Sequence, residues 1–272
     1  MSYLYSKYWP KVNFRLYSLP RRVKNDNEIG WWREKGFDFG VAVPVTLENN
    51  IYKTTSFLSM QYIQNQLIKS KGNIDPNQKL YRGIRLEFQL NRASYTIRNI
   101  TPYIALLFNS KVEISNSSLY SDYKSRRFST ELDLFLPFLY GSNLELYFGY
   151  LARDGDYDYR NDFLPIGYST NNNDKQFRIT TSYYQPLVFL EWQSPIIPIY
   201  IEYIYLKPFI DYSIGYLNTS NLSDIDTINS IGLQISTKNI IFYRYNFEMG
   251  INVYKKSISN NIEYNPFIRF NL

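Results

Sequence analysis

The stretch Phe37–Leu47, with the sequence FDFGVAVPVTL, alternates strictly between two kinds of side chain. Every odd-numbered residue in it is apolar, and the residues between them are small, polar or proline. A period of two indicates a β-strand with one apolar face, because successive side chains of a strand point to opposite sides. This stretch therefore predicts a long strand with one apolar and one polar face.

The same alternation recurs along most of the chain. It is found in Ile84–Asn91, Phe128–Leu136, Asn229–Thr237 and, over the longest run, Ile241–Tyr254. Further strands are predicted at 11–18, 52–64, 102–114, 143–152, 176–187, 199–216 and 260–272. No 3.6-residue period extends beyond about two turns, so helices are not expected. The pattern predicts an all-β chain of about twelve strands.

The predicted connections alternate between short and long. Short turns are expected at 48–50, 140–143 and 237–239, and long polar loops at 65–80, 115–127, 153–175 and 218–228. An antiparallel up-and-down transmembrane β-barrel has this asymmetry, with short turns at one rim and long loops at the other. Its strands must also be long, because about 9–11 residues are needed to cross a bilayer.

Composition restricts the chemistry open to this protein. The chain has 272 residues, a net charge of +6, 18% aromatic residues, no Cys and no His. Disulfides, thiolate or histidine metal sites and Ser-His-Asp triads are therefore excluded. We find no enzyme motif, cofactor site or metal site, and we do not expect an enzyme. The 30 basic residues are scattered among 24 acidic ones, so nucleic acid is not an expected partner.

A large soluble β-sandwich or lipocalin-like barrel is the competing interpretation, since its strands alternate as well. Long strands and mid-strand charges such as Arg85 and Glu87 favour a membrane barrel. So do aromatic residues at predicted strand ends, among them Tyr81, Tyr203 and Tyr205, which we assign to girdles at the lipid–water interfaces. No run of about 20 apolar residues occurs, so a transmembrane helix is not expected. The first residues, MSYLYSKYWPKVNF, lack the features of a secretory signal.

The order of segments resembles the C-terminal barrel of the BamA-type outer-membrane assembly superfamily, also called the bacterial surface antigen family. The segments that resemble it are Tyr81–Leu90 with the NITP sequence at 99–102, then Tyr120–Gly141 and Leu144–Gly155. The likeness is greatest to the branch whose barrel follows a TolB-like propeller. It extends over residues 1–272 and implies a single outer-membrane β-barrel domain.

Barrels of this superfamily have about sixteen strands, more than the number found here. We therefore expect either part of a sixteen-strand barrel or a compact barrel of about twelve strands. In both cases the signal peptide and the upstream periplasmic domain are expected to be absent from this sequence.

The resemblance also implies a loop that folds into the barrel lumen, here residues 154–175. In the family this loop has an Arg-Gly-aromatic motif, and the matching positions here are Pro165, Ile166, Gly167 and Tyr168, with Ile166 at the Arg position. In the family the loop Arg pairs with the Asp of a Phe-x-Asp-x-Gly strand. The matching strand here has Phe209, Asp211, Ser213 and Gly215 on one face, with Ser213 in place of Gly.

Because the loop arginine is missing, Asp211 needs another partner. The basic residues nearest to it in this part of the sequence are Arg153, Arg160, Lys175 and Arg178. In the last strand, Ile268, Phe270 and Leu272 alternate as in the closing strand that the outer-membrane assembly machinery recognises.

The implied function is protein assembly or translocation in the outer membrane of a diderm bacterium. The expected partners are the lipid bilayer, lipopolysaccharide, and client outer-membrane proteins or those delivered by periplasmic chaperones. A passive outer-membrane pore, or a structural barrel without translocation activity, is the alternative that the charged lumen positions leave open.

Overall fold

The computed structural model describes residues 2–5, 10–25, 28–48, 52–72, 79–94, 102–155, 163–166, 168, 174–193, 198–219, 222–242, 244–257 and 261–271. The strands are β1 (Ser2–Tyr5), β2 (Lys11–Asn25), β3 (Glu28–Glu48), β4 (Lys53–Lys71), β5 (Leu80–Ser94), β6 (Ile104–Ser115), β7 (Ser125–Pro137), β8 (Asn143–Gly155), β9 (Lys175–Gln193), β10 (Ile199–Thr219), β11 (Leu222–Ile241), β12 (Tyr245–Lys256) and β13 (Ile262–Asn271). Two short 3₁₀ turns, η1 (Ser117–Leu119) and η2 (Leu139–Gly141), complete the described elements. None of the described helical segments is long or apolar enough to cross a membrane.

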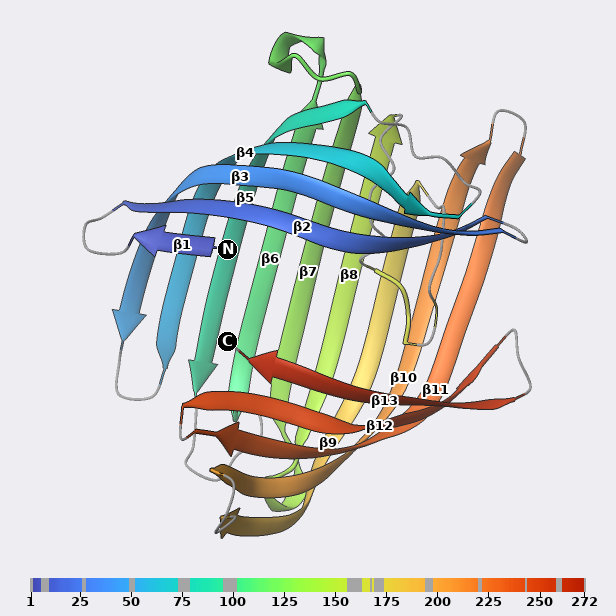
Figure 1. Cartoon of the computed structure of the whole chain (residues 1–272). Helices are drawn as coiled ribbons and strands as arrows, with labels where there is room; N and C mark the ends of the chain where they lie inside the picture. The colour runs from blue at the N-terminus through green and yellow to red at the C-terminus, as the bar shows by residue number, and fades with distance from the viewer. Residues whose placement is uncertain are drawn as a thin grey trace.

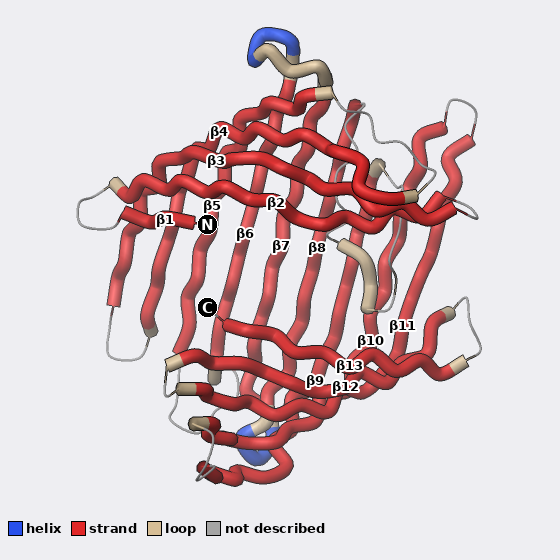
Figure 2. The backbone as a smooth tube through the Cα atoms, in the orientation of Figure 1, coloured by secondary structure: helices blue, strands red, loops and turns tan. Residues whose placement is uncertain are grey.

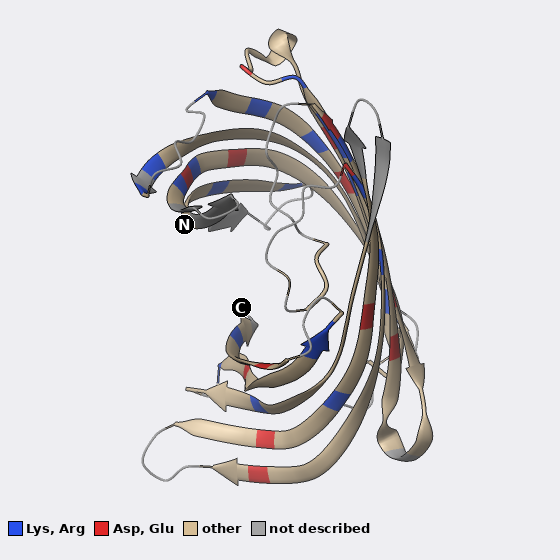
Figure 3. Cartoon of the chain, turned by 90° about the vertical axis from the view of Figure 1, so that its right-hand side faces the viewer, with Lys and Arg blue, Asp and Glu red and all other residues tan. Residues whose placement is uncertain are grey.

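The thirteen strands form one antiparallel sheet in which each strand pairs with its neighbours in sequence (Figure 1). The sheet curls until β1 and β13, with the two chain ends, lie on the same side (Figures 1 and 2). Seen from the side, it has a C-shaped profile (Figure 3). Among the described strands, β1 pairs with β2 alone and β13 with β12 alone. The predicted all-β, up-and-down antiparallel order is confirmed, as a curled sheet that is open between β1 and β13.

The two faces of the sheet differ as the alternation predicts. On the convex face, Phe39, Leu86 and Ile231 are between 49% and 57% exposed. The residues of the opposite face are largely buried although many are polar, as Asp38 and Gln234 are. The observed sheet is therefore polar on its concave side and apolar on its convex side, and no second sheet of described residues covers the apolar side.

Buried charges on the concave face are paired across neighbouring strands. Glu113 on β6 is 4% exposed and accepts hydrogen bonds from the Tyr81 hydroxyl at 2.5 Å and from Arg85 on β5. The Arg85 and Glu113 side chains also form an ion pair at 2.7 Å. A buried carboxylate is tolerated only when it is paired in this way. The position of Tyr81 corrects its assignment to a girdle at the membrane interface, since the ring packs on Ile63 and Tyr123.

The predicted strand Ile241–Tyr254 is wrong, because a turn interrupts it. β11 ends at Ile241 and β12 begins at Tyr245, and between them Phe242 has a left-handed φ of 53°. The alternation conceals this turn, since none of residues 240–245 is Gly, Pro or Asn. The turn expected at 237–239 instead lies within β11, where the Asn239 side chain bonds back to Thr237 at 2.9 Å.

Two of the predicted long loops are strand over much of their length. The polar segment 218–228 belongs to a hairpin in which β10 and β11 stay paired up to Thr219 and Leu222. Segment 65–80 is β4 as far as Lys71. Polar residues are abundant in these strands because one face of the sheet is polar, so polarity alone does not indicate a loop here. The turn expected at 140–143 is confirmed in position by η2.

Replacement of Tyr81 by Phe removes a buried donor to Glu113 while the ring remains. We expect Y81F to lower the free energy of unfolding by about 1–3 kcal/mol, because a charged acceptor loses a hydrogen bond. Urea titration followed by circular dichroism measures this change. Tyr120, which is 82% exposed, provides the matched control, and Y120F should leave stability unchanged. Equal midpoints for the two variants contradict the pairing.

Candidate functional site

The most completely paired carboxylate of the concave face is Asp211 on β10. It is fully buried and forms an ion pair with Arg178 on β9 at 2.6 Å. Arg178 Nε and the Thr180 hydroxyl donate to Asp211 Oδ1 at 2.8 and 2.9 Å. Of the four basic residues considered for Asp211, Arg178 is thus the partner. The register brings it there, because Thr180 is directly opposite Asp211 and Arg178 lies two residues further along the same face.

The fourth bond to Asp211 comes from the long connection between β8 and β9. We call residues 156–174 the strap; the structure describes 163–166, 168 and 174 of it. The Ile166 backbone N–H donates to Asp211 Oδ2 at 2.9 Å. Figures 1 and 3 show the described part of the strap on the concave side of the sheet. The predicted motif residue Ile166 thus meets the predicted strand carboxylate, through its backbone N–H rather than an arginine side chain. Pro165, which precedes it, is fully buried.

Ser213 supports a second attachment of the strap. The Gln176 side-chain amide donates to Ser213 Oγ and to the Phe163 carbonyl, both at 2.8 Å. Ser213 is fully buried and Gln176 is 2% exposed. Glycine at position 213 could not accept this bond, so the serine that departs from the resembled pattern helps to hold Gln176 against the strap.

The Phe163 side chain packs in a space left by a glycine. Phe163 is 1% exposed, and a Cβ added to Gly149 on β8 would lie 2.7 Å from two of its ring carbons. Any other residue at this position would displace the ring. Gly149 is therefore needed for its lack of a side chain, which lets the strap approach the strand closely.

A third attachment lies near the end of β12. The Tyr168 hydroxyl donates to the Asn229 carbonyl at 2.9 Å and lies 3.1 Å from Ser257 Oγ. The Lys256 ammonium is 5.6 Å from the Tyr168 ring centroid and pairs with Glu263 on β13 at 2.7 Å. The strap thus crosses from β8 to the β11–β12 pair and contacts a residue bonded to β13.

The other predicted site residues have different surroundings. Phe209 is 2% exposed and its ring covers Gly232, while Gly215 is buried opposite Gln176. Ile268 and Phe270 lie on the convex face of β13, 65% and 58% exposed, away from the strap. Gly167 and Leu272 are outside the described residues.

Sequence reasoning missed Phe163, Gly149 and Gln176. Alternation along β9 would have found Gln176, since it shares a face with Arg178 and Thr180. Nothing in the sequence pairs Phe163 with Gly149, because the two residues meet only through the path of the strap.

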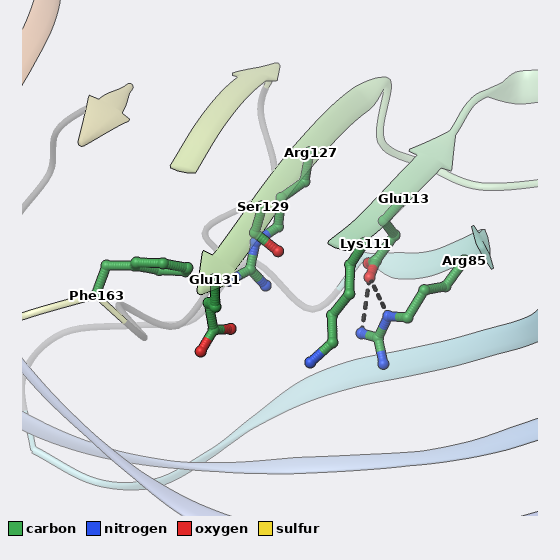
Figure 4. Close-up of a pocket in the computed structure, with 7 residues that line it drawn as sticks. All are labelled: Arg85, Lys111, Glu113, Arg127, Ser129, Glu131 and Phe163. Carbon is green, nitrogen blue, oxygen red and sulfur yellow. Dashed lines mark hydrogen bonds and ion pairs between the residues drawn. The ribbon is translucent and has the colours of Figure 1, made fainter. Parts of the chain in front are cut away.

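A cavity of about 140 Å³ lies beside the strap (Figure 4). The Arg85–Glu113 pair forms one wall, and Lys111, which pairs with Glu87 at 3.4 Å, lies next to it. Its lining residues are Arg85, Lys111, Glu113, Arg127, Ser129, Glu131 and Phe163. The strap therefore leaves a polar space open on the concave face. Among the described residues, no group of three or more acidic side chains is arranged to hold a metal ion.

No family model matches the chain, and no curated protein matches it at a significant level. The site therefore has to be interpreted from its own geometry.

Loss of the Asp211 carboxylate should release the strap. In D211A, Arg178 is left buried without its partner and the Ile166 N–H loses its acceptor, which costs about 3–5 kcal/mol for a buried pair. We expect faster trypsin cleavage after Arg160, within the strap, as measured by limited proteolysis. The control is K238M, which removes the half-buried Lys238–Glu202 pair outside the contacts of the strap and should not change cleavage. The charge swap R178D/D211R should not restore protection, because an arginine cannot accept the Ile166 bond.

Filling the Phe163 site should also displace the strap. G149V places side-chain atoms where the Phe163 ring lies, and we expect cleavage at Arg160 to rise. The double variant G149V/F163A removes the clash and should return the rate toward that of F163A alone. A double-mutant cycle on the cleavage rates measures this coupling, and additive effects would refute the contact.

Proposed function

We propose that this chain is a membrane-spanning β-barrel domain whose convex face contacts lipid, and in which the edges of β1 and β13 pair with each other or with further strands. The apolar residues of that face supply the main support, since Leu86, Met60 and Ile231 on three different strands are between 49% and 57% exposed. Soluble monomers rarely leave an apolar surface this extended in water. Strand length agrees, because each of the strands β2 to β12 has at least 12 residues, more than the roughly 9–11 that cross a bilayer.

The proposed activity is assembly or translocation of proteins, as in the BamA-type superfamily that the sequence resembles. The observation that supports it best is the strap bound inside the sheet through Asp211, because such a segment can gate the concave space. The work is mechanical, with no covalent step. The proposed location is the outer membrane of a diderm bacterium, in contact with lipopolysaccharide and client outer-membrane proteins.

A passive pore is the second candidate. The cavity beside the strap favours it, because Arg85, Lys111 and Glu113 line a polar space on the concave face. Bilayer conductance distinguishes the two proposals. Conductance that persists unchanged after deletion of residues 156–174 supports the pore, whereas conductance that rises on deletion supports a gating strap.

Membrane insertion is tested at Leu86. L86R puts a charge on the convex face, and we expect a loss of about 2–4 kcal/mol of folded-state stability in phospholipid vesicles if the residue lies near the bilayer midplane. The control is Q89K on the opposite face of β5, which should fold normally. Folding is measured by the shift of the unheated band in SDS gels. Equal folding of both variants contradicts a lipid-facing convex surface.

The assembly activity is tested by fixing the strap. The chain has no Cys, so Y168C and S257C can be joined by a bis-maleimide linker with a cleavable disulfide. In liposomes, we expect the protein to accelerate insertion of an unfolded eight-stranded barrel, the cross-link to abolish that acceleration, and reduction to restore it. Equal insertion in empty liposomes rules the activity out.

A further inference from the structure

One strand of the sheet continues past the end of its neighbour. β8 and β9 are paired only as far as Asn143 and Tyr184, whereas β9 continues to Gln193 with β10 on its other side. Residues 185–192 therefore have one side without a neighbouring strand among the described residues. Figure 1 shows this part of β9, in gold, at the lower end of the sheet. We call residues 185–192 the free β9 edge.

The free β9 edge is apolar on both faces. Leu187, Val188, Phe189 and Leu190 are consecutive and between 42% and 49% exposed, and Trp192 is 49% exposed. Val188 and Phe189 are paired in register with Ile204 and Tyr203 and so point to opposite sides, and the register with β10 shifts on either side of them. No polar face therefore exists here as it does in the body of the sheet. This departs from the alternation that holds elsewhere.

The turn next to this edge enlarges the apolar surface. Phe138 and Leu139, between β7 and β8, are 57% and 62% exposed. The Phe138 ring packs edge-on against Tyr183, with centroids 5.6 Å apart, just before the free β9 edge begins. An exposed apolar turn therefore lies next to the free β9 edge at this rim.

The free β9 edge lies beyond the part of the sheet that would span a bilayer. β8 has 13 residues, enough to cross, and it accompanies β9 only to Tyr184. Lipid could not cover this edge in any case, because its unpaired backbone N–H and C=O groups need hydrogen-bond partners. Water satisfies those groups but not the apolar side chains. An added β-strand satisfies both.

Residues of the kinds that usually prevent another strand from pairing at an edge lie on both sides of this apolar stretch. Pro186 lacks a backbone N–H and precedes the apolar stretch, while the charged Glu191, with a φ of 45°, follows it. No charge or proline lies between them, in Leu187–Leu190. Glu191 is exposed and has no ion-pair partner among the described residues. A strand added here thus has defined limits and one acidic group beside it.

We propose that the free β9 edge binds an extended segment of a partner polypeptide as an additional strand. The segment is apolar on both faces over about four or five residues and has a lysine or arginine next to Glu191. This proposal depends on the edge alone and does not require that the strap moves or that proteins are translocated.

The test uses the full chain in detergent and three fluorescent nine-residue probes. The first has five consecutive valine or isoleucine residues flanked by serines, with one lysine near its end. The second replaces that lysine by glutamate, and the third is the first with alternate amides N-methylated. Binding is measured by fluorescence anisotropy. We expect saturable binding of the lysine probe, at least tenfold weaker binding of the N-methylated probe, and tenfold weaker binding to L187D/L190D.

Glu191 and a distant aromatic residue serve as specificity controls. E191K should reverse the preference between the lysine and glutamate probes, and Y120S at the opposite rim should change neither. Failure of the lysine probe to bind, or equal binding of the N-methylated probe, overturns the proposal. In the alternative outcome, sedimentation shows a dimer that L187D/L190D dissociates while no probe binds. That result assigns the edge to a second copy of the chain and also overturns the proposal.

Discussion

A single curled sheet that turns its apolar face outward must pair the charges that it buries on the inside. The concave face does this with a repeated arrangement, in which a carboxylate accepts from a tyrosine hydroxyl and pairs with a cation one or two strands away. The three examples are Glu113 with Tyr81 and Arg85, Glu145 with Tyr184 and Lys207, and Glu248 with Tyr205 and Arg269. This requirement explains part of the unusual tyrosine content, 28 residues in 272.

Asp211 extends the same requirement beyond the sheet. Its carboxylate is satisfied by Arg178, Thr180 and the backbone of the strap at Ile166. The strap is therefore part of the hydrogen bonding of the concave face, and its removal leaves a buried acceptor short of a donor. Tyr168 adds a contact near β12, next to the Lys256–Glu263 pair that reaches β13. The strap therefore contacts Lys256, and Lys256 is bonded to β13, the strand at one edge of the open side of the sheet.

The comparison between sequence and structure separates two kinds of information. Alternation assigned the faces of β3, β5 and β7 and placed Asp211 and Ser213 on the concave side, because a strand has a fixed period. Turns were harder to predict. The turn at Phe242 has no Gly, Pro or Asn near it, and the hairpin at 219–222 resembles a loop because its strands are polar. The tyrosines at strand ends resembled a girdle, although Tyr81 donates to the buried Glu113 and Tyr205 to the half-buried Glu248.

The sequence by itself determined the all-β class, the two faces of each long strand and the order of the strands, since these depend only on local period and chain order. The tertiary structure alone decided that Arg178 is the partner of Asp211, that Phe163 fills the space above Gly149, and that β9 has a free edge. Each of these depends on strand register and on the path of a connection across the sheet. Register relates residues that are far apart in the chain, and no local pattern encodes it.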